Sequence, residues 1–361
     1  MNNKFHNNLT IILLLKGKQK FTKRFVDFYV NSNLKYKLLF ADGDKKIFSN
    51  KIFTKLKKNN INFEYHKFNY DLNYKQFIKK IYLSLNLVKT KYVMLFDNDD
   101  FPIKDSIDKC LLKLENTKDL IGCGGYLINF DLFNKDYKYK NNSLSGNAIN
   151  LAKMNFGVNY IKSKKLDRVS LYLQGKKHTN TINDIFRTKI LKNNYKFLKD
   201  LKFDYIFLYF LVGDILNYSS GKLMKLNIPF IAHQHHQNGL SMKMKNIYES
   251  LDEKDFIEQK KILYKVLSKR FKKLDITNML DQYFFSIKLK SKSYNLNFHN
   301  NIKKKTTPNI LNLFLKLIYK NLKNYYLKFN NTHINKFIKI YKNKKLVNEI
   351  NKIFDFIKKY S

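Results

Sequence analysis

The hydrophobic positions near the start of the chain follow two patterns in turn. Residues 9–15 are an unbroken apolar run, as in a strand that is covered on both faces. Over residues 21–29 aromatic side chains recur at helical spacing with basic residues between them. A second apolar run, residues 36–41, then ends at Asp42. This order predicts a β-α-β opening.

The same alternation continues downstream. Residues 48–56 and 74–87 have the spacing of amphipathic helices and flank a short strand at 61–65. Residues 91–96 form another buried strand, which runs directly into Asp97-Asn98-Asp99-Asp100. Strands that alternate with helices predict the α/β class, with a doubly wound, mostly parallel sheet. Ligands bind such sheets at the carboxyl ends of the strands.

The last third of the chain has a different composition. No acidic residue occurs between Asp281 and Glu349, and lysines recur there among apolar residues at helical spacing. We therefore expect residues 1–249 to form the α/β domain and residues 250–361 to form a basic helical extension. These helices are predicted to lie on an anionic membrane; the alternative is that they pack on the domain with their lysines facing water.

The chain is strongly basic. Its 70 Lys and Arg residues face 28 Asp and Glu residues, a net charge of +42, which exceeds what solubility requires and indicates attraction to a polyanion. The competing interpretation is a lysine-rich genome composition. Cys110 and Cys123 lack metal-ligand spacing and are expected to be reduced core residues. The run at residues 9–15 is too short to span a bilayer, so we expect a cytoplasmic protein, peripheral at most to the inner membrane face.

The acidic segment after the third long strand is the main candidate for chemistry. Carboxylates packed closely at the end of a buried strand repel one another unless a cation compensates them. Mg²⁺ or Mn²⁺ binds through carboxylates and phosphate oxygens, and so can hold a nucleotide diphosphate. The alternative is a solvated loop whose aspartates cap the next helix.

The order of elements, with one strand ending at Asp42 and a later one ending at Asp97-Asn98-Asp99-Asp100, resembles the GT-A fold of family-2-like glycosyltransferases over residues 8–245. Their DxD motif matches Asp97 and Asp99. The resemblance implies Mn²⁺ or Mg²⁺, a nucleotide-sugar donor bound by Asp42, Asp97, Asp99 and Asp100, and a glycan or lipid-linked acceptor. It places Asp42 against the base or ribose. The chain departs from the family at Lys16-Gly17-Lys18, where a Pro and polar residues are usual.

Further site residues follow from the same resemblance. A carboxylate before a hydrophobic helix acts as general base in the family, which maps onto Asp204, with Asp214 as a second candidate; either could instead stabilise a helix. His233 is expected to reach the metal or the diphosphate, unless residues 229–241 are a polar surface loop. Arg187 is a candidate for binding phosphate in a bidentate manner. The alternative is an arginine that lies on a helix surface.

Other functions remain open on this reading. A metal-dependent nuclease or nucleotidyltransferase could also use clustered carboxylates, and the positive charge with many Tyr and Phe residues could serve nucleic-acid binding. The sequence contains no helix-turn-helix, zinc-finger or RNP-like signature. We therefore expect no nucleic-acid partner. The resemblance implies an inverting, hexosyltransferase-like enzyme of cell-surface polysaccharide synthesis.

Overall fold

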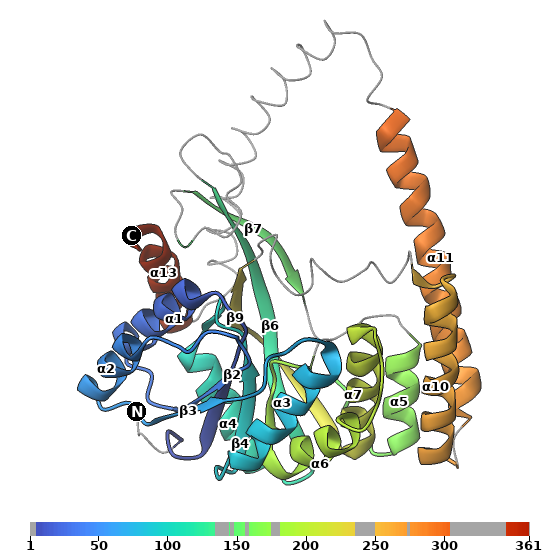
Figure 1. Ribbon diagram of the computed structural model, residues 1–361, viewed down its shortest axis with the longest axis horizontal. Coiled ribbons are helices and arrows are strands. Elements are labelled where there is room, and N and C mark those ends of the chain that lie inside the picture. Colours follow the sequence, from blue (N-terminus) through green and yellow to red (C-terminus); the bar gives the residue numbers. More distant parts are fainter. Residues whose placement is uncertain are drawn as a thin grey trace, which may run out of the picture.

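The computed structural model describes residues 5–133, 144, 148–155, 159–174, 181–234, 250–272, 275–303 and 344–360. In this part of the chain a nine-stranded sheet forms the centre of the molecule (Figure 1). Its strands are β1 (Leu9–Leu15), β2 (Lys37–Asp42), β3 (Phe63–Lys67), β4 (Tyr92–Phe96), β5 (Phe101–Pro102), β6 (Leu120–Phe133), β7 (Ala148–Asn155), β8 (Ile185–Arg187) and β9 (Lys222–Gln234).

The strand order is β3-β2-β1-β4-β8-β6-β9-β5, with β7 paired to β6. Strands β1 to β4 are parallel to one another, and β6 is parallel to β9. The short strand β8 lies antiparallel between β4 and β6, so these two groups of strands point the same way. The carboxyl ends of β1, β2 and β4 therefore meet at one edge of the sheet.

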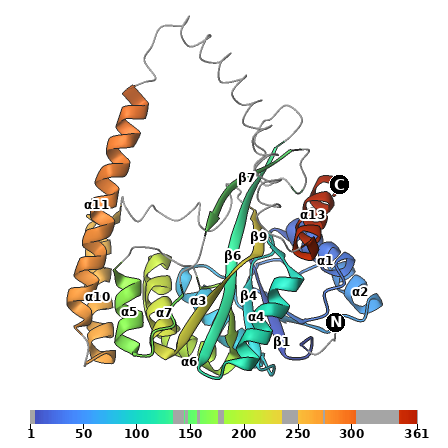
Figure 2. The ribbon, with the colours of Figure 1, turned by 180° about the vertical axis from the view of Figure 1, so that it is seen from behind.

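Helices cover both faces of the sheet (Figures 1 and 2). One hydrophobic core is completed by α1 (Gln19–Asn31), α2 (Asn50–Lys58), α4 (Lys104–Asn116) and α13 (Lys344–Lys359). The other is completed by α3 (Tyr74–Leu87), α5 (Lys165–Leu173), α6 (Thr188–Leu198), α7 (Ile206–Ser220), α10 (Lys254–Arg270) and α11 (Ile276–Lys303). The predicted fold class, a mostly parallel α/β sheet with a C-terminal helical extension, is confirmed.

The helices of the C-terminal region share these cores. Helix α10 contacts α7, α11 contacts α5, and α13 contacts α4. Leu263 of α10, Leu280 of α11 and Ile357 of α13 are fully buried. These buried apolar side chains therefore lie against the α/β domain, while Phe285 and Leu289 of α11 are exposed. The predicted contact of the extension with a membrane stays a prediction. No helix within the described ranges is long and apolar enough to cross a membrane. The boundary near residue 250 stays a prediction.

Candidate active site

Three carboxylates gather in the turn that follows β4. Asp97, Asp99 and Asp100 each place one oxygen within 4.8 Å of the oxygens from the other two. The turn is held against α1, because the Asn98 amide donates to the hydroxyl of Thr22 at 2.8 Å. Asp99 and Asp100 are buried, whereas the Asp97 side chain is exposed. The structure thus brings together the acidic residues that the sequence pattern singled out.

Two cationic side chains face this acidic turn. Lys18 Nζ lies 3.2 Å from Asp99 Oδ2, and His233 Nδ1 lies 2.8 Å from Asp100 Oδ1. Burial alone lowers the pKa of His233, but the carboxylates of Asp100 and its neighbours outweigh this and raise it to about 9. Partial loss of surrounding water, followed by repulsion from Asp99 and Asp100, raises the pKa of Asp97 to about 7, although this side chain keeps contact with solvent. The turn therefore carries more negative charge than its environment accommodates easily.

This donor set fits a hard divalent cation. Mg²⁺ and Mn²⁺ prefer oxygen ligands and bind through a small number of carboxylates. A cation here would also remove the repulsion that raises the pKa of Asp97. His233 contacts Asp100 through Nδ1 and is not one of the three grouped ligands. Its direct metal role stays a prediction, and the neighbouring histidines 235 and 236 lie outside the described residues.

A buried arginine that sequence reasoning missed holds the turn in place. Arg24, on α1, is fully buried and its Nη2 donates to the carbonyl of Asp99 at 3.1 Å and to Gln234 Oε1 at 2.7 Å. Its Nη1 donates to the carbonyl of Leu144 at 2.8 Å. Burial lowers its pKa to about 10. One guanidinium therefore joins α1, the acidic turn and the end of β9.

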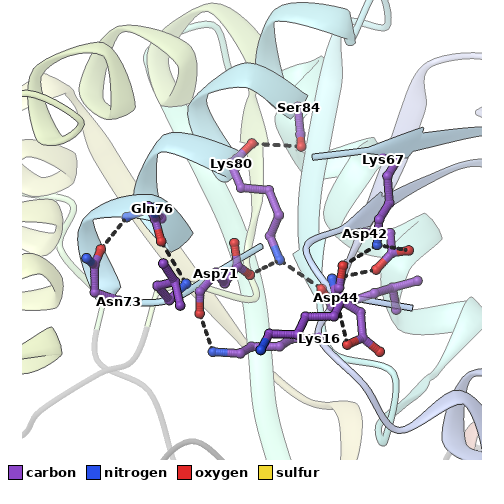
Figure 3. A network of polar contacts seen from close by, with 12 residues as sticks. Lys16, Asp42, Asp44, Lys67, Asp71, Asn73, Gln76, Lys80 and Ser84 are labelled. Atoms are coloured by element: carbon purple, nitrogen blue, oxygen red, sulfur yellow. Dashed lines mark hydrogen bonds and ion pairs between the residues drawn. The ribbon is translucent and has the colours of Figure 1, made fainter. Parts of the chain in front are cut away.

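The end of β2 forms the second part of the site (Figure 3). Asp42 is fully buried, and its carboxylate accepts hydrogen bonds from the Tyr65 hydroxyl at 2.6 Å and from Lys67 Nζ at 3.1 Å. The backbone N–H of Asp44 donates to its other oxygen at 2.8 Å. Asp42 thus occupies the strand end predicted for it, at the same edge of the sheet as the acidic turn.

A buried ion pair lies beside Asp42. Lys80 reaches from α3 to the carboxylate of Asp71 and donates to the carbonyl of Leu15 at 2.9 Å (Figure 3). Burial lowers the pKa of Lys80 and raises that of Asp71, because both charged forms lose water. Asp71 Oδ1 accepts no hydrogen bond within the described part of the chain, although it is buried. Such an unsatisfied acceptor is suited to a donor group on a ligand.

Backbone positions near Asp42 and Asp71 have unusual steric requirements. Gly17 and Lys18 both have positive φ angles, 69° and 56°, and Lys18 is the N-cap residue directly before α1. A left-handed lysine is sterically unfavourable, and such strain concentrates at functional sites. A Cβ on Gly43 would lie 2.4 Å from an oxygen of Asp71. Glycine is therefore required where the strand ends meet the Asp71 carboxylate.

The structure does not bring Arg187 to this site. Arg187 pairs with Tyr92 at the start of β4, whereas Asp97 follows the end of that strand. Its guanidinium donates to the carbonyls of Leu114 and Leu120 at 2.8 Å each, and so caps the C-terminal end of α4. Arg187 thus makes a structural contact in this fold, and its contact with phosphate stays a prediction.

The two candidate bases lie in different environments. Asp204 precedes α7, is exposed, and accepts a hydrogen bond from the Gln259 amide at 2.7 Å. Asp214 lies ten positions further along and is held by the hydroxyls of Thr181 and Tyr172. Burial raises the pKa of Asp214 to about 7. Asp204 is thus open to a substrate from solvent, whereas Asp214 belongs to an interior network.

Comparisons with known proteins add little to this description. No protein-family model and no curated protein matches the chain. Among solved structures, residues 1–349 of S. aureus TarS align at 12% identity and a TM-score of 0.46, covering 76% of this chain and 70% of that one. The same fragment with UDP-GlcNAc aligns at 12% identity and a TM-score of 0.41, covering 73% of each chain. Its complex with UDP aligns at 13% identity and a TM-score of 0.38, covering 75% of this chain and 73% of that one. At these values the likeness establishes no shared activity.

Proposed function

We propose that this chain is a metal-dependent glycosyltransferase that moves a sugar from a nucleotide-sugar donor to a glycan or lipid-linked acceptor. One observation supports the proposal most strongly: two groups of carboxylates lie at the same edge of the sheet. The first is the turn with its three carboxylates, and the second is the buried pair Asp42 and Asp71. The first fits a divalent cation with a diphosphate, and the second fits the hydrogen-bond donors of a nucleoside. A nucleotide diphosphate spans such a pair of subsites.

Each part of the site has a role in this proposal. Asp97 and Asp99, assisted by Asp100, hold Mn²⁺ or Mg²⁺. The bound cation supplies neutralisation of charge on the departing nucleotide diphosphate. Lys18 lies beside Asp99 at the N-terminal end of α1, where the helix dipole also favours phosphate. Asp42 orients the ribose or base, and Asp71 Oδ1 accepts from the nucleoside.

The acceptor is expected to meet the enzyme at the inner membrane face. Since the core-facing apolar side chains of α10 and α13 are buried, we expect the outward lysines to supply most of any membrane attraction, beside exposed apolar side chains such as Phe285 and Leu289. Each lysine near an anionic surface contributes about 1 kcal/mol, and salt screens this attraction over roughly 8 Å. Such binding is peripheral and salt-sensitive.

The proposal is tested by a thermal-shift screen of UDP- and GDP-sugars with and without Mn²⁺. A ligand that binds only the folded protein raises its melting temperature by mass action. We expect at least one nucleotide sugar, with UDP-GlcNAc in the panel, to stabilise the protein only when Mn²⁺ is present. Stabilisation by single-stranded DNA or RNA, and by no nucleotide sugar, would instead support the nuclease alternative.

Asp42→Ala is expected to weaken nucleotide binding about tenfold or more, because a hydrogen bond to a charged group contributes about 1.5–3 kcal/mol. The chemical step should change less, since Asp42 is proposed to contact the base or ribose and not the reacting diphosphate. Calorimetric titration with the nucleotide that the screen identifies measures the effect. Asp44→Ala removes a neighbouring carboxylate and serves as the control. An unchanged affinity in Asp42→Ala excludes this role.

Asp204→Asn is expected to lower kcat by about 10²–10⁴-fold while the donor KM stays similar, as for loss of a general base. The reason is its place before α7, where the resemblance puts the base, together with its exposure to solvent. Steady-state kinetics of transfer measure both constants. Gln259→Ala removes only the amide that contacts Asp204 and should have a small effect. Full activity in Asp204→Asn leaves the base to be sought elsewhere.

A further inference from the structure

A cavity of about 280 Å³ lies among the helices on the face of the sheet covered by α3, α5, α6, α7 and α11. Leu95 of β4 contributes to its wall, two positions before Asp97. The amide of Asn183 donates to the carbonyl of Leu95 at 3.4 Å, which ties the segment beside the cavity to the same strand. The cavity therefore adjoins the strand that carries the acidic turn but lies outside that turn.

One wall of the cavity is polar and already ordered. The carboxylate of Asp214 accepts from the hydroxyls of Tyr172 and Thr181. The Asn217 amide donates to Thr181 Oγ1 at 3.1 Å, and the Asn194 amide donates to Asn217 Oδ1 at 2.8 Å. The Asp214 carboxylate keeps further acceptor capacity beyond these two bonds, since each oxygen has two lone pairs.

The rest of the lining is aromatic and aliphatic. Phe207 and Phe210 of α7 line the cavity and are half-buried, and Tyr283 and Ile287 of α11 line it from the C-terminal extension. A lining that combines polar and aromatic side chains suits a ligand with an apolar face and a rim of hydroxyl groups. A pyranose ring has this distribution of polar and apolar surface.

The volume of the cavity and the charge of its lining also fit a pyranose ring. A cavity of about 150 Å³ holds a benzene molecule, so 280 Å³ corresponds to about 11 non-hydrogen atoms, close to one hexose unit. No Lys or Arg is among the described residues that line the cavity, although the chain has 70 of them. The Asp214 carboxylate would repel a phosphate or carboxylate ligand, and no described lining residue carries a positive charge to offset this, so the cavity disfavours an anionic occupant.

We propose that this cavity binds one uncharged sugar unit, with Asp214 accepting from its hydroxyl groups and α11 closing the site. The cavity is inferred to be a binding site from its geometry alone, independently of the proposed function. Its use for the sugar at the end of the acceptor rests on the proposed transferase function. On that basis the acceptor presents a neutral sugar, and the C-terminal extension contributes to substrate selection.

The test is ligand-observed NMR on the full chain with the methyl glycosides of glucose, galactose, mannose and N-acetylglucosamine. We expect saturation transfer to at least one glycoside with millimolar affinity, and none to ribose 5-phosphate. Gly213→Leu fills the cavity from α7, because a Cβ on Gly213 meets only Leu198 Cδ1 at an ordinary 3.5 Å. This substitution should abolish the glycoside signal, whereas Gly213→Ala should retain it.

Asp214→Asn keeps the shape of the wall and covers the case in which Gly213→Leu fails to fold. It should weaken glycoside binding about tenfold, because one charged acceptor is lost. Mn²⁺-dependent nucleotide binding, measured on the same samples, should be unchanged in all three variants. Failure of every glycoside to bind, binding that survives both Gly213→Leu and Asp214→Asn, or binding of 1-octanol alone overturns the proposal. Glycoside binding without any nucleotide binding would instead contradict the transferase function and leave the sugar site standing.

Discussion

The double variant Asp97→Ala/Asp99→Ala is expected to lose Mn²⁺-dependent nucleotide binding and all sugar transfer. These carboxylates belong to the group that fits the cation, and Asp99 also positions Lys18 at the start of α1. Without the cation the charge of a diphosphate next to Asp100 is uncompensated, so binding and chemistry fail together. Removal of a metal from such a site eliminates a contribution of several kcal/mol to transition-state stabilisation.

The same variant should melt at a higher temperature than the wild type when no metal is present. Repulsion among the crowded carboxylates lowers the stability of the metal-free folded protein, in line with the raised pKa of Asp97. Residues at functional sites commonly oppose stability in this way. Differential scanning calorimetry with EDTA measures the melting temperature, and calorimetric titration with Mn²⁺ and nucleotide measures binding.

Asp200→Ala/Asp252→Ala provides a control with the same change in net charge. Both side chains are exposed, at 69% and 76%, and each pairs with a surface lysine far from the acidic turn in sequence. The control should bind Mn²⁺ and nucleotide like the wild type. Transfer activity that persists in Asp97→Ala/Asp99→Ala would show that the metal and diphosphate bind elsewhere.

The sequence allowed a good prediction of the first half of the sheet. Strands β1, β2 and β4 are interior on both faces, so their apolar runs are continuous and end sharply at polar residues. The acidic turn and Asp42 follow from that pattern, because the ends of parallel strands share one edge. The strand β8 has only three residues, Ile185–Arg187, and is too short to give a periodic signal.

Other parts of the site depend on contacts that are distant in the sequence. Arg24 contacts Gln234, which lies 210 positions away, and Lys80 donates to the carbonyl of Leu15, which lies 65 positions away. Both basic residues occur in amphipathic helices, where the usual expectation is a solvated charge. The scarcity of arginine drew attention to Arg187, but the same signal applied to Arg24. Only the fold distinguishes the capping arginine from the one at the site.

Deletion of residues 250–361 is expected to prevent folding of the remaining domain. Helices α10 and α11, together with Phe271 between them, contribute nine buried apolar side chains to one core, and α13 contributes five to the other: Phe256, Leu263, Leu267, Phe271, Ile276, Leu280, Tyr283, Phe284 and Ile287, then Leu346, Ile350, Ile353, Phe354 and Ile357. Burial of each such side chain contributes about 1.5–3 kcal/mol. A typical domain has a net stability of only about 5–15 kcal/mol. The deletion also exposes the surfaces of α4, α5 and α7 that these helices cover.

A pair of adjacent substitutions on α10 tests the same point without removing any chain. Leu263 is fully buried, whereas Ile262 beside it is 42% exposed. Leu263→Asp places a carboxylate in the core and should give an insoluble or unfolded protein. Ile262→Asp makes the same chemical change on the outward face and should leave the melting temperature nearly unchanged. Circular dichroism and size-exclusion chromatography measure both outcomes.

The outward lysines of the extension can then be tested separately from its packing. Folded Ile262→Asp and wild-type proteins are compared by co-sedimentation with liposomes that contain anionic lipid, over a range of salt concentrations. Peripheral attraction should decline steeply with salt, because screening shortens its range. A truncated chain, residues 1–249, that folds and transfers sugar but no longer sediments with these liposomes would contradict the structural role of α10, α11 and α13. It would establish the extension as a separate membrane-binding unit, whereas loss of the fold on truncation makes it part of the enzyme.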